Sequence, residues 1–140
     1  MIKSVGGIIF VNGKYLLQLR DNKKNIFFPG FWGVFGGLVE KGEKLSQALV
    51  REIKEETSLT VKVTKMIISN GFKVLSFEQK RQRVFYECKI VGKNKIILRE
   101  GKKHRFISYN ELKTLNVVPL DFAAINYHYL WKVKKFKHLP

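Results

Sequence analysis

The chain has 140 residues, the size of one domain, and its 27 Lys and Arg against 11 Asp and Glu give a net charge of +16. With 45% hydrophobic and 13% aromatic residues its composition is globular, and no apolar stretch approaches the roughly 20 residues of a membrane helix. Membrane proteins are therefore excluded, and the single Cys88 excludes an internal disulfide. Because a signal-peptide pattern is also missing, we expect one domain over residues 1–140 and a cytoplasmic location.

The positive charge favours anionic partners such as nucleotides or nucleic acid. However, the basic residues are scattered along the chain except in 101–105 and 132–138, and Lys, Ile, Asn and Phe are all frequent, as compositional drift would produce. Charge of this kind bears on solubility and association more than on a binding site. We therefore expect a small nucleotide-like partner and do not favour nucleic acid. The oligomeric state, a homodimer included, stays open.

The N-terminal part of the chain predicts a β-hairpin. Segments 5–11 and 15–20 are apolar, and the Asn12-Gly13 pair between them supplies the positive φ that a tight turn requires. A polar loop punctuated by Gly and Pro follows over residues 21–31. The chain is therefore expected to begin with two antiparallel strands.

The rest of the sequence mixes helical and strand patterns. Apolar residues recur at i, i+4 and i+8 from Leu45, which predicts a helix over residues 45–57. Later segments rich in β-branched and aromatic residues predict strands, and two others predict helices. The predicted strands are 60–68, 72–77, 82–91 and 95–99, and the predicted helices are 108–115 and 121–135. Without a regular βαβ alternation, these elements indicate an α/β fold with a mixed β-sheet sandwiched between helices.

Acidic residues are concentrated in one window of this basic chain. Five of the 11 lie within residues 40–56, far more than chance placement predicts. Glu52, Glu55 and Glu56 stand at i, i+3 and i+4 of the predicted helix, so their carboxylates share one face and repel. They also lie in its last turns, where the macrodipole disfavours each negative charge by roughly 0.3–1 kcal/mol. Local helix stability therefore opposes this arrangement.

A divalent cation would relieve the repulsion. Mg²⁺ takes hard oxygen ligands and is typically held by one or two carboxylates together with substrate phosphates, which suits diphosphate chemistry. The alternative is a solvated helix face on which Glu52 pairs with Lys44 or Lys54. Taken alone, segment 51–56 favours the solvated helix face. The residues upstream of it make the metal site the preferred interpretation.

Those upstream residues complete a longer motif. Gly37 is followed by five residues, then Glu43, then seven residues before the REIKEE segment at 51–56. The pattern over residues 37–59 resembles the Nudix box, the loop-helix-loop signature of the Nudix hydrolase family, here of the MutT type. It departs at Ser58, where the family has a glycine that ends the helix in a left-handed turn. The departure affects the turn, because no ligand is lost.

The resemblance implies a Mg²⁺ site, with Mn²⁺ as an alternative metal. Glu52 and Glu56 would be the principal ligands, and Glu55 would bind a further ion or act on water. The Gly37 carbonyl would complete the coordination sphere, and Arg51 would orient Glu52. The resemblance also implies a reaction in which water attacks one phosphorus of a nucleotide substrate and the leaving phosphate departs in line.

The general base is less directly implied. In this family it is either a glutamate of the box or a carboxylate from a later loop. Glu100 is the later candidate by its position, and its alternative reading is an ordinary surface charge among lysines.

Substrate-binding residues are expected outside the box. Phe28 and Trp32 would stack on a base, and Phe35 stands where many relatives have proline; core packing is the alternative for these aromatic residues. Asp121 stands where MutT-type relatives place an Asn or Asp that reads a purine edge. Asp121 is also a good N-cap for the last helix, and we favour the capping role.

Three functions remain in competition. The leading hypothesis is Mg²⁺-dependent hydrolysis of a phosphoanhydride bond in a nucleoside diphosphate derivative or in a nucleoside triphosphate, oxidised forms included. The second is pyrophosphohydrolysis at an RNA 5′ end, which the positive charge would assist. The third is a nucleotide-binding regulator that has lost catalysis, against which the intact glutamates argue.

Overall fold

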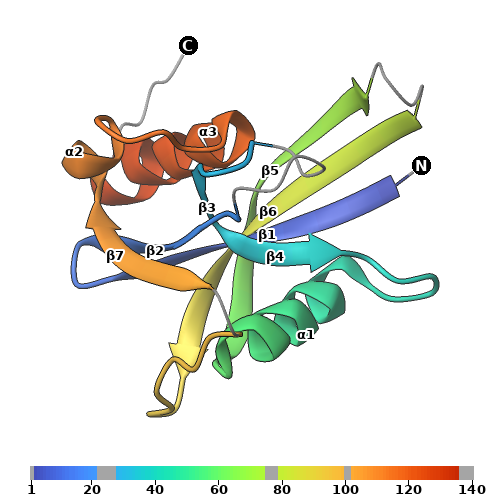
Figure 1. Cartoon of the computed structure of the whole chain (residues 1–140), viewed down its shortest axis with the longest axis horizontal. Coiled ribbons are helices and arrows are strands. Elements are labelled where there is room, and N and C mark those ends of the chain that lie inside the picture. The colour runs from blue at the N-terminus through green and yellow to red at the C-terminus, as the bar shows by residue number, and fades with distance from the viewer. Residues whose placement is uncertain (1, 22–27, 75–78, 100–101, 136–140) are drawn as a thin grey trace.

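A computed structural model describes residues 2–21, 28–74, 79–99 and 102–135. The strands are β1 (Ile2–Val11), β2 (Lys14–Leu19), β3 (Trp32–Gly33), β4 (Phe35–Leu38), β5 (Thr60–Val74), β6 (Gln79–Val91) and β7 (Lys103–Ser108). The helices are α1 (Leu45–Thr57), α2 (Tyr109–Leu112), α3 (Pro119–His128) and the π-helix η1 (Tyr129–Val133). Figure 1 shows α1 and α3 on opposite sides of the sheet. The predicted mixed sheet between helices is confirmed.

The sheet is built around β1. Its strand order is β3-β2-β1-β6-β5, with β4 paired to β1 and β7 paired to β2. β1 runs parallel to β6 and antiparallel to both β2 and β4, which makes the sheet mixed. The predicted hairpin is confirmed, because Asn12 and Gly13 take φ values of 50° and 80° between β1 and β2.

The sheet divides the core into two layers. Alternate residues of a strand point to opposite faces, so neighbours such as Leu16 and Leu17 enter different layers. Leu49 and Ile53 of α1 pack in the layer of Leu16, whereas Ile125 of α3 packs in the layer of Leu17. The apolar stripe predicted for residues 45–57 is therefore the face that α1 buries, and the predicted bounds of this helix are confirmed.

Two strand predictions are wrong. The predicted break between 60–68 and 72–77 is absent, because β5 continues through Ser69, Asn70 and Gly71 while it pairs with β6. Ladder hydrogen bonds to a neighbouring strand override the turn preference of these residues. The segment 95–99 is not a strand in the described structure: Ile96 and Leu98 pack on the core under α1, but the backbone joins no ladder there.

The later helices also begin and end differently from the prediction. α2 covers four residues instead of the predicted eight. α3 begins at Pro119 instead of 121, because proline suits the first helical position, where no backbone N–H is needed. After His128 the chain continues as the π-helix η1. Over the ranges that the structure describes, no helix is both long and apolar enough to span a membrane.

Candidate active site

Helix α1 places part of the acidic segment, residues 40–56, against β4. A Cβ atom added to Gly37 would lie 2.4 Å from Cδ of Glu52 and 2.6 Å from its Oε2. Both distances are far below van der Waals contact, so any side chain at position 37 would displace the Glu52 carboxylate. Gly37 therefore makes room for Glu52 beside the backbone of β4.

Arg51 joins Glu52 to two other carboxylates. Its guanidinium donates two hydrogen bonds to Glu43, of 2.8 and 2.9 Å, and one of 3.0 Å to Glu52. It also donates to Glu55 at 3.3 Å and to the Leu38 carbonyl at 3.1 Å. A planar group with five donors can hold these partners together, whereas a lysine ammonium could not reproduce the fork.

Glu43 and Glu52 respond differently to the shared arginine. The hydrogen bonds from Arg51 and from the Glu40 backbone lower the pKa of Glu43 to about 2. Burial raises the pKa of Glu52 in spite of the hydrogen bond from Arg51, and the charges of Glu55 and Glu56 add to the rise. The protein therefore does not fully balance the negative charge of ionised Glu52, and a bound cation would balance it.

The left-handed turn of the motif is also present. Ser58 ends α1 with a φ of 64°, and its backbone N–H donates to the Lys54 carbonyl. A serine thus adopts the conformation for which glycine is usually required. The turn leads directly into Leu59, which is buried in the core under α1.

The glutamates carry the right donors for a divalent cation. Glu52 and Glu56 lie one turn apart on α1, both with side chains about one-sixth exposed (16% and 14%), and Glu56 contacts Arg99 at 3.4 Å. In the part of the chain that the structure describes, three or more His, Cys, Asp or Glu side chains nowhere converge on a single metal position. Mg²⁺ usually binds through one or two carboxylates, with water and substrate phosphates completing its sphere, so this donor set fits the ion.

A pocket of about 480 Å³ opens beside these residues. Gly36, Gly37 and Leu38 of β4 form part of its wall, and Gly37 is also the residue against which Glu52 lies. The volume falls within the roughly 300–1,000 Å³ of pockets that enclose small molecules. Gly37 is therefore common to the pocket and to the carboxylate cluster.

Asp121 lies in this pocket in a buried ion pair. Its carboxylate accepts hydrogen bonds from Arg83 at 3.1 and 3.4 Å and from the Val34 backbone at 3.0 Å. The capping role that the sequence favoured is wrong, because Val118 is the N-cap and Asp121 is the third residue of α3. The carboxylate turns toward β4 and β6 and lines the pocket, as the competing substrate-reading hypothesis requires.

The three aromatic candidates for substrate binding lie in different parts of the structure. Phe28 lines the pocket and is 42% exposed. Phe35 has no exposed surface and packs in the core under α1, so it cannot stack on a substrate as placed. Trp32 packs at the edge of the other core layer, where its ring lies 5.7 Å from the Arg105 guanidinium, and it does not line the pocket. Of the three, Phe28 is the one at the candidate site.

Glu100, the candidate general base, lies outside the described residues. Before it, Arg99 contacts Glu56 at 3.4 Å, and the Ile97 backbone N–H donates to the Thr57 carbonyl at 2.9 Å. The chain that precedes Glu100 is therefore attached to the end of α1.

The sequence did not identify the arginines of the pocket. Arg20, Arg81 and Arg83 all line it, and Asp121 is the one acidic residue among its described lining residues. Burial lowers the pKa of Arg20, and the charge of Asp121 opposes that shift. A signal was present in β6, where Arg83 stands two positions before the buried Phe85 and therefore on the same face of the strand, and a charge so placed needs a partner or a ligand.

Comparison with known proteins places these features in a family. Residues 2–129 match the NUDIX domain family. The chain is 30% identical to the nucleoside triphosphatase NudI of Escherichia coli K12 over 114 residues, which cover 79% of this chain and 80% of NudI. It is also 45% identical over 64 residues, 46% of the chain, to an ADP-ribose pyrophosphatase of Methanocaldococcus jannaschii. That match covers 36% of the length of the pyrophosphatase.

A solved structure agrees with the fold. The MutT protein of Methanosarcina mazei Go1 superposes with a TM-score of 0.75 at 22% sequence identity, covering 96% of each chain. At this identity the likeness bears on the fold alone.

Proposed function

Since the chain belongs to the NUDIX domain family and is thus a Nudix pyrophosphohydrolase, we propose that it hydrolyses a nucleoside diphosphate derivative or a nucleoside triphosphate with the help of Mg²⁺. One observation carries the proposal: Gly37 lines a pocket of about 480 Å³ and also lies against the Glu52 carboxylate. A nucleotide in the pocket would therefore present its phosphates to the acidic face of α1.

The charges of the pocket support a phosphorylated substrate. In the described lining, Arg20, Arg81 and Arg83 stand against one acidic residue, Asp121, which already pairs with Arg83. Arginine is well suited to phosphate because its donors match pairs of phosphate oxygens. Phe28 at the pocket wall offers an exposed ring for a base.

The metal would be held by Glu52 and Glu56, with Glu55 and the Gly37 carbonyl as further oxygen donors, and Mn²⁺ could replace Mg²⁺. When bound, such a cation withdraws negative charge from phosphate oxygens and so favours attack by water on phosphorus. Arg51 positions Glu52 and Glu55 through its hydrogen bonds and keeps them from moving apart by repulsion.

The names of the relatives define the substrates to test. One is called a nucleoside triphosphatase and another an ADP-ribose pyrophosphatase, so both substrate classes belong in one panel. We would measure release of phosphate and pyrophosphate from nucleoside triphosphates, oxidised triphosphates, nucleotide sugars, ADP-ribose and 5′-triphosphorylated RNA, with and without Mg²⁺. We expect metal-dependent turnover of a small nucleotide. Turnover of every substrate at full rate in excess chelator would overturn the proposed metal dependence.

The metal site is tested by Glu56→Gln and Glu52→Gln. We expect kcat to fall by more than about 100-fold in each, since even residues that only support a metal ligand are worth roughly 10–100-fold. Mn²⁺ affinity, followed by electron paramagnetic resonance, should fall in parallel. The matched control is Glu111→Gln, which removes an exposed 2.7 Å ion pair with Arg105. If both site variants kept full Mn²⁺ affinity, Glu52 and Glu56 would not be metal ligands.

A further inference from the structure

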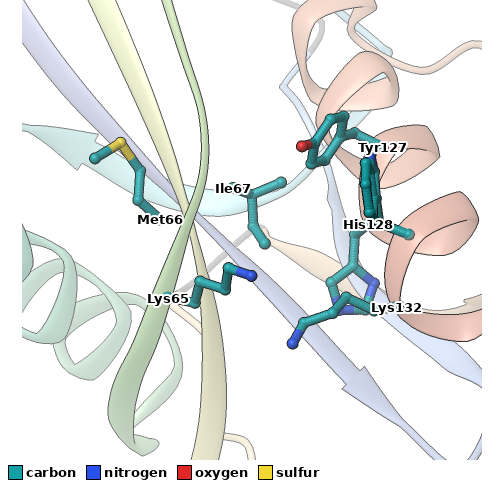
Figure 2. Close-up of a pocket in the computed structure, with 7 residues that line it drawn as sticks. Lys65, Met66, Ile67, Tyr127, His128 and Lys132 are labelled. Atoms are coloured by element: carbon teal, nitrogen blue, oxygen red, sulfur yellow. The ribbon is translucent and has the colours of Figure 1, made fainter. Parts of the chain in front are cut away.

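A second, smaller pocket lies at the opposite end of α3 from the nucleotide pocket. It has a volume of about 240 Å³ and is enclosed by β5 and by the C-terminal part of α3 with η1. Figure 2 shows Lys65 and Ile67 on the side of β5 that faces the helix, with Met66 on the other side. Nothing in the proposed hydrolysis uses this pocket.

Two large aromatic rings border the pocket at the surface. Tyr127 is 41% exposed and Trp131 is 38% exposed, and their ring centroids lie 6.1 Å apart at an interplanar angle of 38°. Exposed aromatic residues that gather in one place are a feature of binding surfaces. Trp131 belongs to the π-helix η1, a rare element that is frequent at functional sites.

Two lysines give the pocket a positive charge. Lys65 extends from β5 toward the helix, and Lys132 extends from η1 into the same space (Figure 2). The pocket has no acidic residue among its described lining residues. His128 lies at its base with both ring nitrogens engaged, by Tyr15 and by Glu87, each at 2.8 Å. The groups available to a ligand are therefore two rings and two ammonium groups.

Rings combined with cations fit a base and its neighbouring phosphates. Proteins that bind single strands stack successive bases on aromatic side chains and hold the backbone by positive charge. The volume of about 240 Å³ is below the roughly 300–1,000 Å³ of pockets that enclose a whole small molecule. It suits one base of a longer strand, with the phosphates outside the pocket.

A second copy of the chain is a poorer occupant. In a two-fold contact each residue of the patch faces the same patch on the partner. Lys65 and Lys132 would then face lysines, in a protein whose net charge is already +16. A polyanion relieves this charge instead of doubling it.

We propose that the pocket formed by Lys65, Tyr127, Trp131 and Lys132 binds single-stranded nucleic acid. One base lies against the two rings, and the flanking phosphates lie against the two lysines. The site is separate from the nucleotide pocket and does not depend on the proposed function.

The test is the affinity for a fluorescein-labelled single-stranded oligouridylate, measured by fluorescence anisotropy in EDTA. Trp131→Ala should weaken binding by about tenfold, since one stacked base is worth roughly 5- to 150-fold in affinity. Trp131→Phe keeps a ring and should retain most of the affinity. The double variant Lys65→Gln/Lys132→Gln should lower the salt dependence of binding, by up to about 0.7 in the logarithmic slope for each phosphate that the protein no longer neutralises.

Matched controls separate this site from general charge. Lys93→Gln and Val91→Ala remove an exposed lysine and an exposed apolar residue outside both pockets, and neither should change the affinity. Tyr127→Ala tests the second ring if Trp131→Ala fails to fold, as judged by thermal unfolding. Unchanged affinity in the ring variants would overturn the proposal.

Three other results would also overturn the proposal. The first is displacement of the oligonucleotide by polyglutamate of equal charge as effectively as by unlabelled strand, which would reduce binding to charge alone. The second is dissociation of a wild-type dimer by Trp131→Ala in sedimentation, which would make the pocket an interface between copies. The third is loss of binding in Arg83→Met/Asp121→Leu together with full binding in Trp131→Ala, which would place the strand in the nucleotide pocket.

Discussion

The two ends of α3 are joined to the same strand by different contacts, an ion pair at one end and a hydrogen bond at the other. At the N-terminal end the helix supplies the acid, Asp121, and β6 supplies the base, Arg83. At the C-terminal end the helix supplies His128 and β6 supplies the acid, Glu87. Arg83 and Glu87 stand four positions apart, on one face of β6, so a single strand holds both ends of the helix.

The order of these contacts favours one direction of the helix. An acid near the N-terminus of α3 agrees with the helix dipole. If α3 ran the other way, Asp121 would meet Glu87 and His128 would meet Arg83. The two contacts therefore favour one orientation of α3, and that orientation carries Asp121 to the nucleotide pocket.

The two ends of α3 differ in the chemical groups that they offer to a ligand. Arg83 and Asp121 form a charged pair that lines the nucleotide pocket. Burial lowers the pKa of His128, and Glu87 only partly opposes the shift, so His128 donates as a neutral ring. Burial opposes ionisation of Glu87, but hydrogen bonds from Thr64 and His128 outweigh it and lower the pKa of Glu87. One end is therefore charged and the other is a chain of hydrogen bonds.

The largest stability effect is expected at the charged end. Asp121→Asn leaves the Arg83 guanidinium without its counter-charge, with the side chain of residue 121 only 3% exposed, and should cost about 3 kcal/mol of unfolding free energy. Urea unfolding monitored by circular dichroism measures this cost. The matched control is Asp21→Asn, whose partner Lys102 lies 3.3 Å away in a more exposed pair worth under about 1 kcal/mol. Equal costs for the two variants would contradict the comparison.

Breaking the contacts at the C-terminal end of α3 should cost less unfolding free energy. His128→Ala removes both hydrogen bonds, which leaves the buried Tyr15 hydroxyl without a partner and Glu87 with the hydrogen bond from Thr64 alone, at a cost of about 2 kcal/mol. The same unfolding measurement applies, with the exposed His104→Ala on β7 as the control. A cost above that of Asp121→Asn would reverse the proposed ranking of the two ends.

A double replacement should separate stability from substrate binding. Arg83→Met/Asp121→Leu exchanges the buried pair for apolar side chains and should unfold within about 1 kcal/mol of the wild type. The nucleotide KM should still rise, because the pocket loses one of its arginines. Steady-state kinetics beside urea unfolding give both quantities. An unchanged KM would mean that Arg83 serves the fold alone.

The smallest expected effect is a pH dependence confined to the histidine end. Because the folded pKa of His128 is lowered, the unfolded chain binds more protons as the pH falls. The contribution is complete above the unfolded pKa, near 6.5, and is lost as the pH falls toward the lower folded value. Thermal unfolding between about pH 7.5 and pH 5.5 should show a loss of stability that is reduced in His128→Gln. An equal loss of stability in His128→Gln would mean that another group causes the pH dependence.

Local patterns predicted the parts of this structure that depend on local forces. The apolar spacing at Leu45, Leu49 and Ile53 gave both ends of α1, since a helix face needs only neighbours in sequence. The turn at Asn12 and Gly13 was also readable, because its backbone conformation demands those residues. The acidic window likewise pointed to Gly37, which the structure places against Glu52.

Long-range contacts decided the parts that the sequence did not predict. Asp121 and Arg83 are 38 positions apart, so the capping role looked sufficient until β6 brought the arginine to it. Pairing with β6 likewise carried β5 through a segment with turn residues. Segment 95–99 contains the apolar run Ile96-Ile97-Leu98, yet in the described structure it joins no ladder and so is not a strand. An apolar run indicates side chains that face the core, but the hydrogen-bonding partners of a strand come from elsewhere in the chain.

The left-handed Ser58 bears on how this enzyme could acquire new specificity. Substitutions that reshape a pocket usually lower stability, and a protein accepts them only while it stays above its folding threshold. Ser58, with a φ of 64°, is outside the lining of the nucleotide pocket. Ser58→Gly should raise the unfolding free energy by up to about 1 kcal/mol, measurable as a higher urea midpoint. Directed evolution of the pocket that starts from the glycine variant would therefore tolerate more changes than evolution from the natural chain.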